Sequence, residues 1–312
     1  MNEYHIHLAI LVGIYLILAQ SFHLTFGLAG AFNLAHVASY AVGAYTTALL
    51  STEVFAPYCA ALGPATQSTA MLWLCHEGNF LICILTSMVL SGIFAFSIGA
   101  ISLRLDAEYF AIGTLAFSSL ISALLINWKS LTRGVLGIPG IPRPELFGLD
   151  FYQNINFLVL VAVLAGLVMT LLAFVFHNSF ARKLRAQSEA PQAAMALAVD
   201  TRNLKNTCFF ISSALAGLAG SLFAYYINYI DPSSFSLTEM VFVLTIVVVG
   251  RPGSFWGGAV ATVFMVLLPE PLRFIDIPPS VLGPIRQMLY AIILFSVVYI
   301  NRAKLWPPER KI

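Results

Sequence analysis

Runs of about 20 consecutive apolar residues recur along this chain, and they limit its possible folds more than any other feature. A helix needs about 20 such residues to cross the roughly 30 Å hydrocarbon core of a bilayer. Because the runs are continuous and do not alternate with a period of two, they predict helices rather than barrel strands. The predicted spans cover residues 6–26, 28–50, 80–102, 108–126, 155–177, 207–230 and 283–301.

Composition supports this conclusion, since 59% of the 312 residues are hydrophobic and only 10% are charged. Too little polar surface remains to cover a soluble domain. A further apolar stretch, residues 237–268, is interrupted at 250–253 and leaves halves of about 14 residues, which form either two short spans or one re-entrant hairpin. We therefore expect an all-α, polytopic integral membrane helical bundle, with about eight or nine spans, some short or broken, in a single domain over residues 1–312.

Basic side chains are distributed unevenly between the loops, which predicts the orientation of the chain. If the C-terminus is cytoplasmic, loops 103–107, 178–206 and 251–253 face the cytoplasm and the N-terminus lies outside. The cytoplasmic segments then hold Arg104, Arg182, Lys183, Arg185, Arg202, Lys205, Arg251, Arg302, Lys304, Arg310 and Lys311. The outer segments hold only Lys129, Arg133, Arg143 and Arg273, with Arg286 near an outer helix end. This bias is the positive-inside pattern.

Residues 178–206 are the one long polar and basic interruption among the apolar runs, so we expect them to face an aqueous compartment. Their centre is rich in alanine, and Pro191 is tolerated only near a first turn, which predicts a short helix starting close to Ala190. Glu189 would lie at the positive N-terminal end of that helix. Such a helix can dock into a groove on another protein; the alternative is an inert basic loop that only sets topology.

Asn33 and His36 are polar residues inside a predicted span that is otherwise rich in small residues. They are three residues apart, so we expect them to share a helix face. Polar groups at membrane depth are costly unless they meet a partner or a water-filled path, which makes both residues candidates for a translocation path. The alternative is a single interhelical hydrogen bond. Tyr225 and Asn228 are further candidates, although tyrosines here are also typical of an interfacial aromatic belt.

The predicted outer loops contain two further features. Repeated glycines and prolines at 137–144 predict a stiff loop, which suits either docking of a soluble partner or a cap over the bundle. Cys59 and Cys75 share one outer loop, where they form either a disulfide or two unpaired thiols.

Several classes of function lack support in the sequence. The chain has no Gly-x-x-x-x-Gly-Lys-Ser/Thr loop, no His-Glu-x-x-His and no Cys-x-x-Cys, so we expect it to bind no cofactor or metal and to have no catalytic residues. Acidic residues fall almost entirely at span ends, with Glu239 the nearest exception. A stand-alone secondary transporter or channel usually buries such a residue in mid-membrane, so that alternative is disfavoured.

Four segments in a shared order resemble the permease subunits of the branched-chain amino-acid ABC importer family, of the subunit type called LivM. These segments are 30–45 with Asn33-Leu34-Ala35-His36, 103–115, 137–144 and 189–220. A further similar motif follows at Gly253-Ser254-Phe255-Trp256-Gly257. The resemblance extends over nearly the whole chain.

The resemblance implies a permease subunit that translocates branched-chain, hydrophobic amino acids delivered by an external solute-binding protein. The other implied partners are a second permease subunit of the LivH type, two cytoplasmic ATPase subunits that use ATP and Mg, the small-molecule solute and membrane lipid, with no nucleic acid. The implied location is the bacterial cytoplasmic (inner) membrane. Related permeases with the same motifs are thought to carry urea or other small polar solutes, which is the alternative.

The resemblance also implies that residues 178–206 are a cytoplasmic coupling loop through which the ATPases move the permease. The residues that match its Glu-Ala-Ala motif are Glu189, Ala193 and Ala194. Two departures from the family pattern involve glycine: Ala198 stands where a glycine is expected, and Arg251-Pro252 replaces Gly-Gly. The tail Trp306-Pro307-Pro308-Glu309 also differs from the family's usual Arg-Pro-x-Gly.

Overall fold

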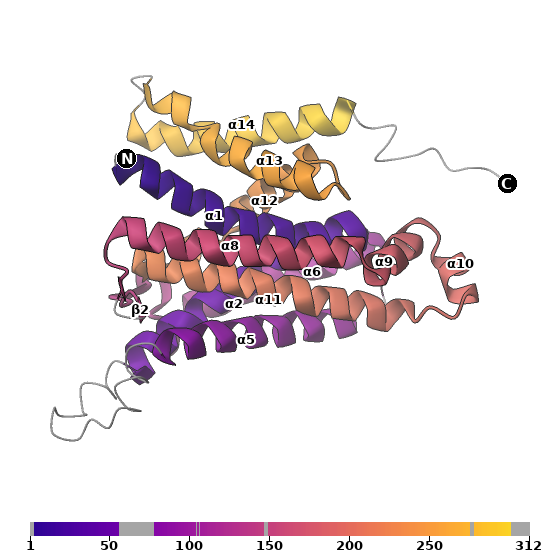
Figure 1. Cartoon of the computed structure of the whole chain (residues 1–312), viewed down its shortest axis with the longest axis horizontal. Coiled ribbons are helices and arrows are strands. Elements are labelled where there is room, and N and C mark those ends of the chain that lie inside the picture. The colour runs from indigo at the N-terminus through magenta and orange to yellow at the C-terminus, as the bar shows by residue number, and fades with distance from the viewer. Residues whose placement is uncertain are drawn as a thin grey trace.

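Long apolar helices run side by side through the molecule, in a computed structural model that describes residues 3–55, 78–103, 105, 107–146, 149–274 and 278–300 (Figure 1). These residues contain twelve α-helices, of which seven belong to segments long and apolar enough to cross a membrane. A further apolar helix, α12 (Leu237–Val249), is shorter. The all-α class is therefore confirmed.

The elements have the following bounds. The long helices are α1 (Glu3–His23), α5 (Asn79–Ser102), α6 (Ala107–Asn127), α8 (Asn154–His177), α11 (Thr201–Ile227) and α14 (Pro279–Ile300). Helix α13 (Phe255–Leu267) is shorter, but the apolar segment that contains it continues to Leu272. The other short helices are α2 (His36–Leu49), α7 (Lys129–Thr132), α9 (Ser179–Glu189) and α10 (Pro191–Ala196). π-Helical turns η1 (Leu24–Leu28) and η2 (Leu50–Phe55) extend α1 and α2, and 3-10 turns lie at η4 (Gly134–Leu136), η5 (Pro232–Phe235) and η6 (Glu270–Phe274). Two antiparallel strand pairs join β1 (Ile138–Pro139) to β4 (Tyr229–Ile230) and β2 (Glu145–Leu146) to β3 (Leu149–Asp150).

Most predicted spans coincide with helices, but the span predicted over 28–50 is wrong at its start. Residues 29–35 are not helical, and α2 begins only at His36. Gly30 adopts a φ of +63°, which an α-helix does not accommodate, and it sits so close to Ser188 that an added Cβ would lie 2.9 Å from the Ser188 Cβ. The interruption at 250–253 is confirmed, because α12 ends at Val249 and α13 starts at Phe255.

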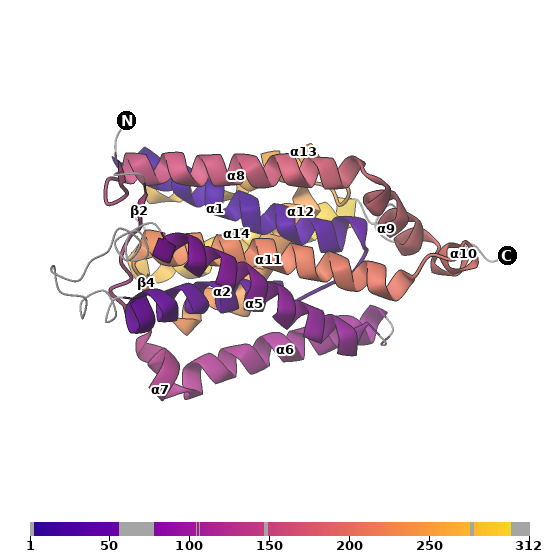
Figure 2. The same cartoon turned by 60° about the horizontal axis from the view of Figure 1, so that its bottom comes forward.

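Helix α11 lies at the centre of the bundle and packs against α1, α2 and α5 (Figure 2). Glycine permits very close backbone contact there, as is common between membrane helices. A Cβ added to Gly220 would lie 2.1 Å from the Tyr40 carbonyl oxygen of α2, and one on Gly43 would lie 2.5 Å from the Gly217 Cα. Helix α14 lies at the periphery, where none of its apolar window is buried.

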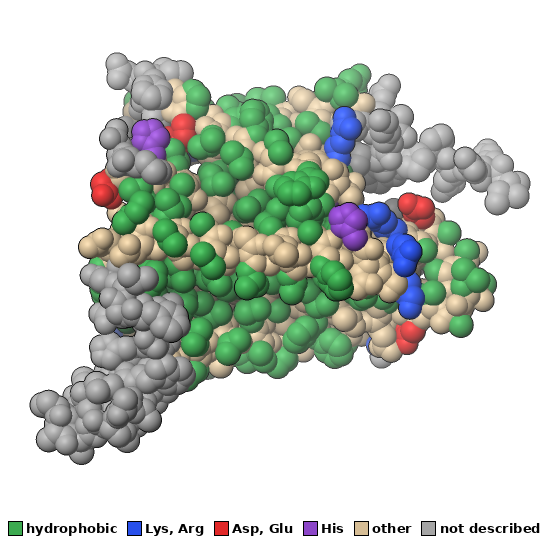
Figure 3. Space-filling view, viewed as in Figure 1, with side chains coloured by type: hydrophobic (Ala, Val, Ile, Leu, Met, Phe, Trp, Pro, Cys, Tyr) green, Lys and Arg blue, Asp and Glu red, His purple; other side chains and the backbone are tan. Residues whose placement is uncertain are grey.

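The predicted cytoplasmic loops meet at one end of the bundle, where α9 and α10 project and Lys and Arg side chains gather (Figure 3). Arg202 Nη2 donates to the Ala100 carbonyl oxygen at 3.1 Å, and Gly253 N donates to His23 Nε2 at 2.7 Å. The N-terminus, α7 and the strand pairs lie at the opposite end, which we call the outer end. The predictions for Arg104, Cys59, Cys75, Arg302, Lys304, Arg310, Lys311 and Trp306-Pro307-Pro308-Glu309 fall outside the described residues.

Candidate functional site

Helix α9 is an amphipathic link between the bundle and the tip of the polar loop. Asn178 caps its start, because the Asn178 Oδ1 accepts a hydrogen bond from Ser179 N at 2.6 Å. Ala181, Leu184 and Gln187 recur at intervals of three residues and are buried. The spacing places them on one face of the helix, and α9 contacts α8, α11 and η1 in the bundle.

Helix α10 forms the tip and exposes an apolar surface, with Pro191 in its first turn as predicted. Ala194 is buried, whereas Ala193 is exposed. Glu189 is also exposed and is the last residue of α9, directly before Ala190, the N-cap of α10. The next residues, Met195 and Leu197, are 54% and 80% exposed. An exposed apolar helix end of this kind can enter a groove on another protein.

Ala198 closes α10 in a conformation that usually requires glycine. Its φ is +57°, in the left-handed region. Val199 N donates to the Ala194 carbonyl oxygen at 3.1 Å, and Ala198 N donates to the Met195 carbonyl oxygen at 3.0 Å. This is the geometry of a helix end at which glycine normally takes the left-handed position. Alanine therefore takes the left-handed position at this helix end.

His36 and Asn33 do not share a helix face, contrary to the prediction, because Asn33 precedes the first residue of α2. The Asn33 Oδ1 accepts from Ala35 N at 3.0 Å, which caps the irregular segment locally. His36 is fully buried, and its Nε2 lies 3.0 Å from the Ser21 Oγ. Since Ser21 Oγ itself donates to the Leu18 carbonyl oxygen, it accepts this bond from His36. His36 thus joins α1 to α2.

A buried set of hydroxyl groups fastens α2, α5 and α11 together, and sequence reasoning missed it. Thr47 Oγ1 donates to Ser221 Oγ at 2.8 Å and lies 2.7 Å from Ser87 Oγ. Ser91 Oγ donates to the Ser39 carbonyl oxygen at 2.9 Å. The sequence feature that could have predicted these contacts is the four-residue spacing of Ser87 and Ser91. This spacing places both serines on one face of α5, the face that meets α2.

Asn228 and Tyr225 lie at the outer end of α11 in well-packed surroundings. The Asn228 Oδ1 accepts from Arg143 Nε at 3.2 Å, and its Nδ2 donates to the Ile141 carbonyl oxygen at 2.7 Å. Tyr225 is buried with its ring 5.4 Å from that of Phe80. Asn228 therefore anchors the 137–144 loop.

Arg143 is the centre of this outer anchor. Its Nη1 donates to the Tyr152 carbonyl oxygen and to Asn154 Oδ1, both at 3.0 Å, and its Nη2 donates to the Tyr226 carbonyl oxygen at 3.1 Å. The guanidinium also lies 5.7 Å from the ring centre of Phe157. A planar group with five donors can satisfy all these partners at once, which lysine cannot.

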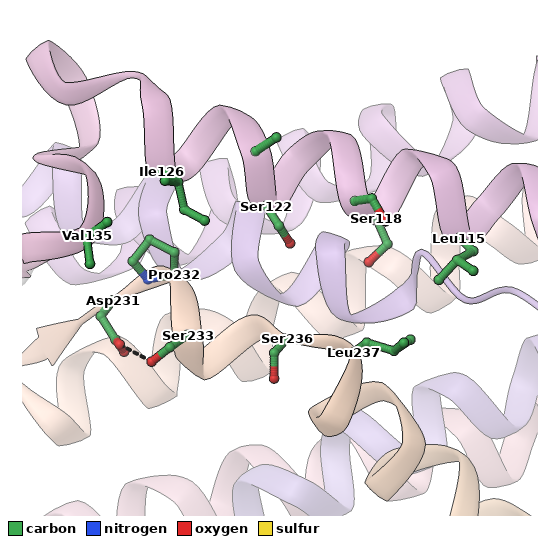
Figure 4. A pocket seen from close by; sticks show the side chains of 12 residues that line it. Leu115, Ser118, Ser122, Ile126, Val135, Asp231, Pro232, Ser233, Ser236 and Leu237 are labelled. Carbon is green, nitrogen blue, oxygen red and sulfur yellow. Dashed lines mark hydrogen bonds between the residues drawn. The ribbon is translucent and has the colours of Figure 1, made fainter.

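A cleft of about 600 Å³ opens between α6 and residues 231–237, and we call it the outer cleft (Figure 4). Its walls mix hydroxyl groups, one carboxylate and apolar side chains. They include Leu115, Ser118, Ser122, Ile126, Asp231 and Leu237. The sequence did not predict this site, although the four-residue spacing of Ser118 and Ser122 indicates that both lie on one face of a helix.

Glu239 lies in the first turn of α12, and its Oε1 is buried without a hydrogen-bond partner among the described residues. Within those same residues, no group of three or more His, Cys, Asp or Glu side chains could hold a metal ion. Cys83 and Cys208 are buried free thiols. Two described surfaces that could interact with other molecules are the α10 tip and the outer cleft.

Comparison with known proteins identifies relatives of this chain. A family model described as "Branched-chain amino acid transport system / permease component" matches residues 4–298. The permease proteins LivM of the high-affinity branched-chain amino acid transport systems of Escherichia coli (strain K12) and Salmonella typhimurium are each 31% identical to it over 86% of its length. A probable branched-chain amino acid transport permease protein LivM of Methanocaldococcus jannaschii is 25% identical over 95% of this chain and 91% of the relative. The chain spans 63% of the length of the first two relatives. No solved structure matches it.

Proposed function

This chain belongs to the permease family of branched-chain amino acid ABC transport systems, and from that premise we propose that it translocates branched-chain, hydrophobic amino acids in a bacterial cytoplasmic membrane. It is a non-enzymatic transport subunit with several membrane spans. The observation that carries the proposal is the family match over residues 4–298, joined to an exposed apolar helix at the tip of the basic loop.

The proposed assembly contains this chain as one transmembrane permease domain over residues 1–312, a second permease of the LivH type and two ATPases that bind ATP and Mg. An external solute-binding protein delivers the amino acid. The N-terminus would lie outside, with the C-terminus and the coupling loop 178–206 in the cytoplasm. The gathering of Lys and Arg at the α9 end supports this orientation.

The coupling mechanism follows from the α9 and α10 geometry. The ATPases would hold α10 through the exposed residues Glu189 and Ala193, with the exposed Leu197 side chain filling a groove. Ala194, the third residue of the motif, is buried and would instead pack α10 against the rest of this chain. The buried face of α9 would pass the movement to the bundle, which would then alternate between outward-open and inward-open states.

Charge reversal at Glu189 tests the proposal. In the reconstituted complex, Glu189→Lys should uncouple ATP hydrolysis from leucine uptake while leaving membrane insertion intact. The matched control is Glu53→Lys, because Glu53 is an exposed carboxylate that pairs only weakly with Arg133, at 3.9 Å, near the outer end. Wild-type uptake by Glu189→Lys, or a failure of any ATPase to co-purify with the chain, would reject the coupling role.

Two alternatives give different results in the same assay. A urea permease of the same family would show ATP-driven uptake of urea that leucine does not compete with. A stand-alone secondary transporter would take up solute without ATPase subunits; the buried Glu239 carboxylate is the feature that favours it.

A further inference from the structure

The outer cleft is a cavity that neither the coupling tip nor the Arg143 anchor uses. It lies between one face of α6 and the segment that leads into α12 (Figure 4), toward the outer end where α7 and β4 lie, opposite α10 (Figure 2). Its volume of about 600 Å³ falls within the range of about 300 to 1,000 Å³ that is usual for small-molecule sites. A solute that arrives from outside would meet this cleft early.

One wall of the cleft carries an ionised carboxylate. Ser234 Oγ donates to Asp231 Oδ1 at 2.5 Å, and Ser233 Oγ donates to Asp231 Oδ2. Partial burial acts to raise the pKa of Asp231, but hydrogen bonds from the side chains and backbones of Ser233 and Ser234 outweigh it and lower that pKa. Among the described residues, Asp231 has no Lys or Arg partner within ion-pair distance. The Asp231 carboxylate, which lines the cleft, is therefore held by the two serine hydroxyls and by no ion pair among those residues, so its negative charge is uncompensated there.

The opposite wall offers hydroxyl groups and apolar surface. The side chains of Ser118 and Ser122 point from α6 toward the 231–237 segment (Figure 4). Leu115 and Leu237 line the cleft at the same end as Ser118. Hydroxyl groups can donate to a carboxylate, and the leucine side chains can cover an aliphatic group.

We propose that the outer cleft is a subsite for the zwitterion of an aliphatic α-amino acid, with Asp231 receiving the ammonium group. Ser118 and Ser122 donate to the carboxylate, and Leu115 and Leu237 cover the side chain. This inference rests on the proposed function and adds where the solute is recognised. It also separates the substrate classes, because neutral urea gains nothing from the Asp231 charge.

The first test removes the charge but keeps the shape. Asp231→Asn keeps one acceptor oxygen for one serine hydroxyl, and its Nδ2 can donate to the Oγ of the other serine, so both side-chain contacts of the turn can be kept. The complex is reconstituted in liposomes, and uptake of radiolabelled leucine is measured at saturating loaded binding protein. Loss of one charge-assisted bond should lower the uptake rate about tenfold. The control Glu53→Gln removes a carboxylate near the outer end that does not line the cleft, and it should leave uptake unchanged.

A second test does not depend on Asp231. Ser122→Phe fills the cleft and should abolish uptake, whereas Ser97→Phe places the same bulk on an exposed site of α5 outside the cleft and should be tolerated. Ser122→Cys should react with a membrane-impermeant thiol reagent added outside, and leucine supplied with its binding protein should slow that reaction. The wild-type chain corrects for its own cysteines.

The outcomes separate the two ideas. If the wild-type complex takes up leucine while Asp231→Asn and Ser122→Phe match it, the subsite is refuted and the proposed function stands. Reaction at Ser122→Cys that leucine does not slow also refutes the subsite. If the wild-type complex does not take up leucine, the proposed substrate fails, and the subsite fails with it.

Discussion

The contact between α2 and α11 makes a quantitative prediction about stability. In Gly220→Ala, the new Cβ would lie 2.1 Å from the Tyr40 carbonyl oxygen and 2.8 Å from Ala44 N. Both atoms belong to the backbone of α2, so neither can rotate away. Ordinary contact begins near 3.4 Å, and the two helix backbones would have to separate locally by about 1.3 Å.

Overpacking of this kind typically costs about 1 to 3 kcal/mol. Helix propensity offsets up to about 1 kcal/mol, because alanine is the better helix former. Because both contacts are with backbone atoms, the overpacking cost should lie at the upper end, about 3 kcal/mol, and the net loss of unfolding free energy should be about 2 kcal/mol. At roughly 2 to 3 °C per kcal/mol for a chain of this size, the Tm should fall by about 4 to 6 °C.

Thermal unfolding in one detergent, followed by the loss of the monodisperse peak, measures this change. Gly166→Ala is the matched control, because Gly166 lies in α8 and an added Cβ there meets nothing within 4 Å. Its Tm should stay level or rise. A Gly220→Ala variant as stable as Gly166→Ala would show that the α2 and α11 backbones do not touch in the protein.

Two further predictions concern turns and anchors. Ala198→Gly should raise the free energy of unfolding by about 0.5 to 1 kcal/mol, because it removes a Cβ from a left-handed position. The control Ala196→Gly, in the helical part of α10, should lower the free energy of unfolding by about 1 kcal/mol. Equal Tm changes for both variants would contradict the Ala198 geometry. Arg143→Lys should lower the free energy of unfolding by about 1 to 3 kcal/mol, because lysine cannot reach all the partners of the guanidinium. The control Arg133→Lys, on the exposed surface, should change the Tm little. An Arg143→Lys variant as stable as the wild type would refute the anchor role.

The sequence predicted the architecture well where apolar length alone decides it. Continuous apolar runs locate α1, α5, α8 and α14 within a few residues, because each helix must satisfy its backbone internally across the membrane. The start of α2 was not predictable in this way. Residues 29–35 are as apolar and small as a span, and only the tertiary contact of Gly30 with Ser188 shows why the helix is delayed.

Sites formed by neighbouring residues could be predicted from the sequence, whereas sites formed by residues far apart in the chain could not. Pro191 and the alanines after it fixed the position of α10, because helix starts follow local rules. The role of Asn228 could not be read locally, since its partner Arg143 lies 85 residues earlier in the chain. The outer cleft was missed for the same reason: Ser122 and Asp231 belong to segments that meet only in the fold.

The hydroxyl contacts among Thr47, Ser87 and Ser221 restrict where a solute can travel. These hydroxyl groups already form hydrogen bonds with one another, and the backbones of α2 and α11 are in close contact beside them at glycine positions. A molecule that passed between α2, α5 and α11 would have to break those bonds and part those backbones together. If this chain translocates a solute as proposed, the route would therefore avoid the centre of the subunit and follow one of its outer faces, where the proposed second permease would complete the path.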